Sequence, residues 1–271
     1  MKVAATVLFL LSLASYAFAH GEAVHETETE SFFHMYPQLD VALYGTAALV
    51  ILGMFVVYFG KKFTKFEKKA AFAVMVVTSL AVTGYLIMST VQLNTIAETG
   101  GPVHWHADYE VWACGEKLVL EESEGLANKV GSEVLHHHND DRIHIEGVLV
   151  RKSDASLGAF FGALGGALTG SELSVLMHDG TWKAWKNGDR CPDGTAGTVQ
   201  VFVYRVANPA SKPWMYAQEK LANADAYVIS PFGQVPQGDC IIVEFGEAKE
   251  LTEHLCASYA IAVQKGELYG S

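Results

Sequence analysis

Residues 104–112 read His-Trp-His-Ala-Asp-Tyr-Glu-Val-Trp and alternate polar with apolar side chains. Successive side chains of a β-strand point to opposite faces of the sheet. The stretch therefore predicts a strand whose one face carries His104, His106, Asp108 and Glu110. The other face is apolar and can close over a hydrophobic core. We take this strand as the start of a globular domain that occupies residues 104–271.

A second stretch repeats the alternation. Residues 142–146 read Arg-Ile-His-Ile-Glu, which places His144 and Glu146 on one face and two isoleucines on the other. A run of three histidines, residues 136–138, comes just before it. If the strands around residues 106 and 144 pair, imidazoles from separate segments meet, and imidazole is a common ligand of transition metals. The sequence thus predicts a metal site, for zinc or copper.

The expected ligands come from both strands and from the histidine run. Three or four donor atoms must converge at about 2.0–2.2 Å from the ion. The simplest set is His104, His106, His138 and His144, with His136 or Glu146 as a fifth ligand or a hydrogen-bonding neighbour. Asp108 or Asp141 can orient a ring by accepting its other N–H proton. The remaining histidines, including His178 and His254, are interpreted as surface or core residues.

The N-terminal residues 1–19 predict export. They combine a lysine, an apolar run and the small-x-small sequence Ala17-Phe18-Ala19, the pattern of a signal peptide. An uncleaved membrane helix is the alternative, although the run is short for a bilayer core that needs about 20 residues. Cleavage after Ala19 would make His20 the N-terminus, where its amine and ring can chelate copper, but no other feature supports this arrangement.

Two longer apolar runs, residues 41–59 and 70–91, lack charged side chains, and each can cross a bilayer as a helix. The loop between them, residues 60–69, contains five lysines and one glutamate, so the positive-inside rule places it in the cytoplasm. The acidic stub at residues 20–40 and everything after residue 91 then lie outside. We expect a multi-pass protein of the cell membrane, in contact with lipid, with both termini extracytoplasmic. Buried core helices of a soluble protein are the alternative.

All four cysteines follow the second apolar run, and an even number in an exported domain suggests two disulfides. The sequence allows three pairings. We favour Cys240 with Cys256, because Cys240 opens a predicted strand and Cys256 lies on a helix that can fold back beside it. Cys114 then pairs with Cys191.

The domain that follows a linker at residues 92–103 is expected to be α+β. Its helices are predicted at residues 156–164, capped by Asp154 or Ser153, and at 248–264, with a short one within 212–221. A hairpin, a helix packed across it and later strands suggest a ubiquitin-like β-grasp. Strands are predicted at residues 109–114, 116–120, 142–150, 198–206, 227–230 and 240–245, the first two forming a tight hairpin or one bent strand at Gly115.

The histidine pattern also resembles that of a family. Four segments, His104–Ala107, His136–His138, Ile143–Glu146 and Leu157–Phe161, resemble in order the HxHA, paired-histidine, IHIE and LGxFF motifs of an uncharacterised family of exported or membrane-anchored archaeal and bacterial proteins. Residues 239–246 are similar to the closing strand of that family. The resemblance covers most of residues 104–246. It implies an ordered domain to which these histidines belong, and it implies no reaction.

Three functions fit these observations. The first is a membrane-tethered extracytoplasmic metal-binding protein. The second is a metal-dependent hydrolase with Glu146 as general base beside an open coordination position. The third is an envelope scaffold or a subunit of a membrane complex, since small residues such as Gly45 on the first apolar run permit close helix packing. Residues 91–271 hold 24 acidic and 13 basic side chains, which argues against nucleic acid as a partner.

Overall fold

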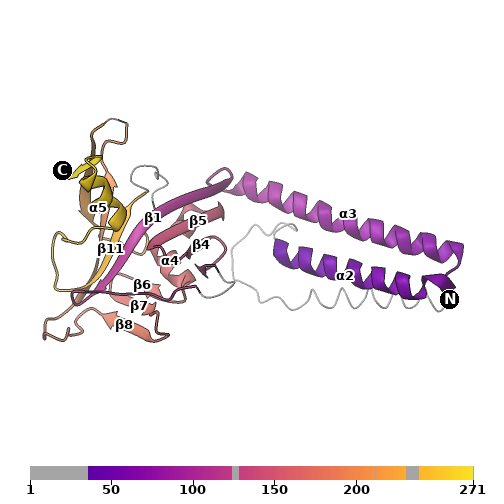
Figure 1. Cartoon of the computed structure of the whole chain (residues 1–271), viewed down its shortest axis with the longest axis horizontal. Coiled ribbons are helices and arrows are strands. Elements are labelled where there is room, and N and C mark those ends of the chain that lie inside the picture. Colours follow the sequence, from indigo (N-terminus) through magenta and orange to yellow (C-terminus); the bar gives the residue numbers. More distant parts are fainter. Residues whose placement is uncertain (1–35, 124–127, 211, 230–237, 271) are drawn as a thin grey trace. The chain divides into compact units, whose positions relative to one another are not determined.

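The computed structural model describes residues 36–123, 128–210, 212–229 and 238–270. The chain divides between Leu93 and Asn94 into two compact units. The first contains two long apolar helices and the second is mostly β, in keeping with the predicted α+β class (Figure 1). The predicted signal peptide at residues 1–19 and the stub up to residue 35, including His20, lie outside the described residues.

The first unit contains helix α2 (Gln38–Phe59), a 3₁₀ turn η2 (Gly60–Lys62) and helix α3 (Lys65–Ile96). A reciprocal pair starts α3: Thr64 N donates to Glu67 Oε2 at 2.8 Å, and Glu67 N donates to Thr64 Oγ1 at 3.3 Å. The helix therefore begins inside the predicted loop at residues 60–69 and runs on into the predicted linker. By length and composition, both helices are long and apolar enough to cross a membrane.

Contacts within this unit join α2 to α3. Gln38 Nε2 donates to Ser89 Oγ at 2.7 Å. A Cβ on Gly45 would lie 2.6 Å from Val82 Cγ2, so the glycine permits the close approach. The pairing of residues 51 positions apart makes the two helices a hairpin.

Strand β1 (Pro102–Ala113) is longer than the predicted strand at residues 109–114, because it includes the histidine stretch and the end of the predicted linker. It pairs antiparallel with β5 (Arg142–Val148) and parallel with β11 (Cys240–Gly246). A two-residue turn joins it to β2 (Glu116–Lys117). The turn has positive φ at Cys114 (52°) and Gly115 (83°), as a hairpin of this length requires.

A nine-stranded sheet has the order β12-β10-β9-β11-β1-β5-β4-β3, with β2 beside β1. A three-stranded sheet has the order β6-β7-β8. The strands not yet defined are β3 (Val130–Gly131), β4 (Leu135–His137), β6 (Ala167–Leu168), β7 (Glu172–Leu176), β8 (Trp182–Lys186), β9 (Thr198–Val206), β10 (Trp214–Lys220) and β12 (Leu268–Gly270). The predicted strands at residues 198–206 and 240–245 are confirmed.

The main core lies on one face of the large sheet. Apolar side chains of β1 and β5, such as Tyr109 and Ile143, pack there with helix α4 (Leu157–Ala163), and the Tyr109 and Phe160 rings lie 5.2 Å apart. Ser156 caps α4, since its side chain accepts from Ala159 N. The caps predicted at Asp154 and Ser153 were wrong, because both residues lie in a preceding 3₁₀ turn, η3 (Lys152–Ala155).

A second cluster covers half of the opposite face. It is built around Phe202, Ile242 and Tyr259, beneath helix α5 (Ala257–Gln264). Register places Glu110 of β1 opposite Ile242, so this face is the one that carries the polar side chains of β1. α5 therefore covers the β9 and β11 half and leaves the β1, β5 and β4 half to the histidines.

Four local predictions were wrong. The segment predicted as a short helix within residues 212–221 contains strand β10 instead, with alternate side chains half-buried. Residues 227–229 make only an isolated bridge, Val228 with Ser156, and the strand predicted at 116–120 ends at Lys117. The helix predicted at 248–264 begins only at Ala257. Before it, the backbone N–H groups of Lys249 and Thr252 donate to the side-chain oxygens of Gln200 and Gln218 instead of to helical carbonyls.

Both disulfides have the pairing that the sequence analysis favoured. Cys114 bonds to Cys191 with a Cα–Cα distance of 5.5 Å, and Cys240 bonds to Cys256 at 5.7 Å. Cys256 is the residue just before α5, so the second bridge fixes that helix to the start of β11. No cysteine remains free.

Candidate metal centre

Three neighbouring strands position the histidines. In the β1–β5 register, His106 lies opposite His144 and His104 lies opposite Glu146. In the β4–β5 register, His136 also lies opposite His144. Cross-strand partners share a face of the sheet, so β5 carries the central histidine of a continuous polar patch. The isoleucines between these residues, Ile143 and Ile145, are fully buried in the core on the other face.

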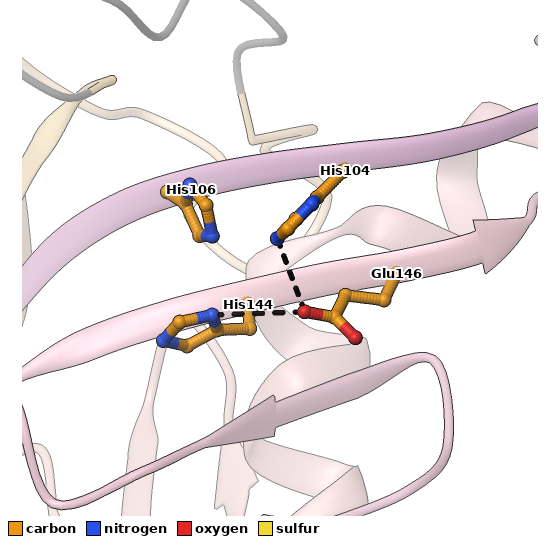
Figure 2. A group of neighbouring side chains, drawn as sticks. All are labelled: His104, His106, His144 and Glu146. Carbon is orange, nitrogen blue, oxygen red and sulfur yellow. Dashed lines mark ion pairs between the residues drawn. The ribbon is translucent and has the colours of Figure 1, made fainter.

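Four residues of β1 and β5 form what we call the outer group: His104, His106, His144 and Glu146 (Figure 2). One potential donor atom from each lies within 4.8 Å of the others. His104 Nε2 is 3.1 Å from Glu146 Oε1, and His144 Nδ1 is 4.0 Å from the same oxygen. The ring of His106 lies between, with centroids 4.6 Å from those of both other histidines.

The inner group consists of His136, His138 and His144, whose donor atoms also lie within 4.8 Å of one another. The His136 and His144 rings are nearly parallel, with centroids 5.6 Å apart. The His138 ring stands edge-on to both, at 4.7 Å from His136 and 4.6 Å from His144. His144 thus belongs to both groups.

The two groups differ in exposure. The side chains of His104 and Glu146 are 65% and 42% exposed, whereas His136 is only 1% exposed. Nδ1 of His136 is buried without a hydrogen-bond partner. Buried polar atoms nearly always have a partner, so this nitrogen is available to a ligand that the chain itself does not supply.

Burial also sets the protonation of the rings. It lowers the pKa of His106 and of His136, and the neighbouring imidazoles lower both further. A lowered pKa keeps an imidazole neutral at neutral pH, and the neutral ring is the form that binds metal.

Asp140 is the residue that the sequence analysis missed. Its Oδ2 lies 3.1 Å from Nε2 of His144 and accepts a hydrogen bond from that nitrogen when it carries a proton. Burial raises the pKa of this carboxyl, but the hydrogen bonds and charges of His144, His138 and Arg142 together lower the pKa overall. A carboxylate bonded to the remote nitrogen of a ligating histidine is a recurrent feature of metal sites.

The two aspartates predicted for that orienting role are occupied elsewhere. Asp108 Oδ1 binds Arg142 Nε at 2.8 Å, and Asp141 Oδ2 binds Lys117 Nζ at 2.8 Å. Asp140 was overlooked because it lies in the turn before β5, where strand alternation gives no direction. Glu110 also pairs with Lys117, at 3.0 Å, so the polar face of β1 changes from possible ligands to ion pairs along its length.

The other histidines of the described residues join neither group. His137 points to the opposite face, with its ring 6.2 Å from that of Tyr109. His178 lies 3.5 Å from Glu122, and His254 stacks on Trp112 at 3.6 Å. His25 and His34 lie outside the described residues.

The donor set fits a transition-metal ion. Two ligands bound at about 2.1 Å can be at most about 4.2 Å apart, so donor atoms within 4.8 Å need only small side-chain rotations to close on an ion. Imidazole nitrogens with one carboxylate suit zinc, copper, nickel or iron, while the hard cations magnesium and calcium prefer oxygen ligands.

Comparison with known proteins adds no further guide, since no family model, curated protein or solved structure matches the chain. The family resemblance described from the sequence therefore stays a prediction. What the site can do is argued below from its own residues.

Proposed function

We propose that this chain is a membrane-tethered metal-binding protein whose β domain holds zinc or copper on its histidine face. One observation carries the proposal: three strands bring five imidazoles and a carboxylate together on one face. Solvated surface histidines have no reason to converge in this way. The buried, unpartnered Nδ1 of His136 supports it independently, because a nitrogen in that position costs stability unless something binds it.

The choice of zinc or copper rests on the donors. All four cysteines are in disulfides, so no thiolate is available to the site. Nitrogen-rich ligand sets favour zinc and copper among the common ions, with copper the more tightly held. Glu146 lies among the outer ligands, 3.1 Å from His104 Nε2, which favours a binding role over that of a free general base in a hydrolase.

Three features support the membrane tether and its orientation. In the most apolar stretch of each helix, few residues are buried: 11% of them in α2 and none in α3. The apolar side chains of both helices are therefore exposed, as they would be in contact with lipid. Two disulfides are typical of oxidising compartments, which supports an extracytoplasmic position for the β domain. The basic residues Lys61 and Lys62 at the turn between the helices fit the cytoplasmic side.

We also propose a ubiquitin-like grasp as the heart of the β domain. The four central strands have the order β5-β1-β11-β9, the inner two are parallel and the outer pairs antiparallel. Helix α4 lies between the second and third of these strands in the chain, as such a fold requires.

Elemental analysis of the full-length chain purified in detergent tests the metal site. After dialysis against zinc and removal of excess ion, the native chain should retain metal and a His104→Ala, His106→Ala, His144→Ala variant should lose most of it. A matched control changes His178 and His254 to alanine, because neither belongs to the groups, and should retain the native amount. A native chain that holds no zinc and no copper contradicts the proposal.

A further inference from the structure

The histidine face contains two overlapping groups instead of one. The outer group is carried by β1 and β5 and the inner group by β4, the residue after it and β5; His144 is the only residue they share. We propose that the face binds two transition-metal ions at once, with the ring of His144 bridging them. This inference rests on the proposed function and extends it to the number and roles of the ions.

The two nitrogens of His144 face different partners. Nδ1 lies on the side of the outer group, 4.0 Å from Glu146 Oε1. Nε2 lies 3.1 Å from Asp140 Oδ2. Each ring nitrogen has one lone pair in the plane of the ring, so a single imidazole can serve two ions only through its two nitrogens. The outer ion then takes Nδ1, and the inner ion takes Nε2.

Asp140 lies beside the inner group, at Nε2 of His144, but is not among the donor atoms that already lie within 4.8 Å of one another. Its carboxylate lies against the ring of His144, and it also accepts a hydrogen bond from the backbone of His138. An ion between Nε2 and Oδ2, at about 2.1 Å from each, fits the 3.1 Å that now separates them. The inner ligands are therefore His136, His138 and His144, with Asp140 as a fourth ligand once its carboxylate moves toward the ion. The outer ligands are His104, His106, His144 and Glu146.

The proton and charge balance is consistent with a bridge. A neutral ring carries one N–H proton, and the second ion displaces it, through Asp140, to solvent. The ring becomes an imidazolate with one negative charge. Two divalent ions then face three negative charges, from the imidazolate, Glu146 and Asp140, so most of their charge is neutralised within the site.

Burial assigns the ions different roles. The inner ion replaces the missing partner of His136 Nδ1, the most buried nitrogen of the two groups, so we expect it to be held more tightly and to exchange more slowly than the outer ion. The outer ion is bound by His104 and Glu146, both well exposed, so it is open to exchange with metal in solution. The inner ion is structural and the outer ion is the one that the protein takes up or releases.

Metal counting separates this inference from the proposed function. The full-length chain in detergent, loaded with zinc, should hold two ions per chain by elemental analysis. The His104→Ala, His106→Ala variant should hold one, and so should the His136→Ala, His138→Ala variant. A native chain with one ion overturns the two-ion inference and leaves the proposed function intact, whereas a chain with none overturns both.

Copper tests the bridge itself. In the chain loaded with two Cu²⁺ ions, a shared imidazolate couples the unpaired electrons, so the electron paramagnetic resonance signal should be much weaker than two isolated ions give. Each half-site variant should recover the full signal of one ion. Two uncoupled ions in the native chain would overturn the bridge. If the His136 variant fails to fold, as judged by tryptophan fluorescence, Asp140→Asn takes its place and should likewise leave a single ion.

Discussion

Replacing His136 with leucine should make the metal-free protein more stable. It should also reduce the stabilisation that the protein gains from metal. Leucine is close to histidine in volume and has no polar atom, so it fits a position that is 1% exposed. In the native chain, Nδ1 of that ring is buried without a partner, and such an atom costs about 1–3 kcal/mol of stability. The substitution removes this cost and, with it, a ligand of the inner group.

The magnitude can be set against the effect of metal. We expect the variant to gain about 1–3 kcal/mol without metal, or roughly 2–4 °C in melting temperature for each kcal/mol in a domain of this size. An ion present at a hundred times its dissociation constant stabilises the folded state by about 2.7 kcal/mol. The native chain should therefore gain more from zinc than the variant does, and the order of stability can reverse.

Thermal unfolding followed by tryptophan fluorescence, with chelator and then with zinc, measures both effects. All five tryptophans lie between residues 105 and 214, so the signal reports on the β domain alone. His178→Leu is the matched control, because that exposed ring belongs to neither group, and it should leave the response to zinc unchanged. A variant that is less stable than the native chain in chelator, and that keeps the full response to zinc, would refute this reasoning.

Three further predictions follow from the fold. Replacing both cysteines of the Cys114–Cys191 bridge with serine should cost roughly 4.5 kcal/mol, and the same change at Cys240–Cys256 roughly 3 kcal/mol, because the closed loops span 77 and 16 residues; urea unfolding measures both. Gly238→Ala should destabilise the domain by more than 1 kcal/mol and weaken zinc binding, because φ is +79° and the new Cβ would lie 1.8 Å from the carbonyl oxygen of His106. Gly170→Ala, with open space around it, is the control, and equal stability of the two variants would contradict this prediction. Burial raises the pKa of Tyr109, Tyr227 and Tyr259. The stability that they contribute is therefore complete below the pKa of tyrosine in the unfolded chain, near 10, and is lost as the pH rises above it. Their phenolate absorbance should appear together with unfolding seen by circular dichroism, and phenolates that form before unfolding would disprove the prediction.

The strands with the strongest local pattern could be predicted from the sequence. Residues 198–206 and 240–245 are nearly continuous in β-branched and aromatic residues, as expected of central strands buried on both faces. Strand β10 was predicted as a helix, because its sequence, Trp-Met-Tyr-Ala-Gln-Glu-Lys, has no clear apolar alternation. Its half-buried side chains include Gln218 and Lys220, whose stems pack while their polar ends donate to the backbone carbonyls of Thr252 and Lys249.

The histidine face of the sheet could be predicted for a different reason. Strand alternation alone puts His104 with His106, and His144 with Glu146, so pairing of the two strands was enough to bring these residues together. The division into two groups was not predictable, because it depends on the β4–β5 register and on the turn that places Asp140. Neither the length of a turn nor its φ values, such as 61° at Asn139 and 53° at Asp141, can be read from residue types alone.

Alternate side chains of strand β5 serve the metal site and the hydrophobic core, since the ligand His144 lies between the buried Ile143 and Ile145. Inserting or deleting one residue there would invert the strand, sending imidazole into the hydrophobic interior and isoleucine into water. Insertions or deletions of one residue within this strand are therefore ruled out, whereas the loop after it, which supplies no ligand, is free to vary in length. Relatives of this protein that bind metal in the same way should differ in their loops while the intervals within each strand stay fixed.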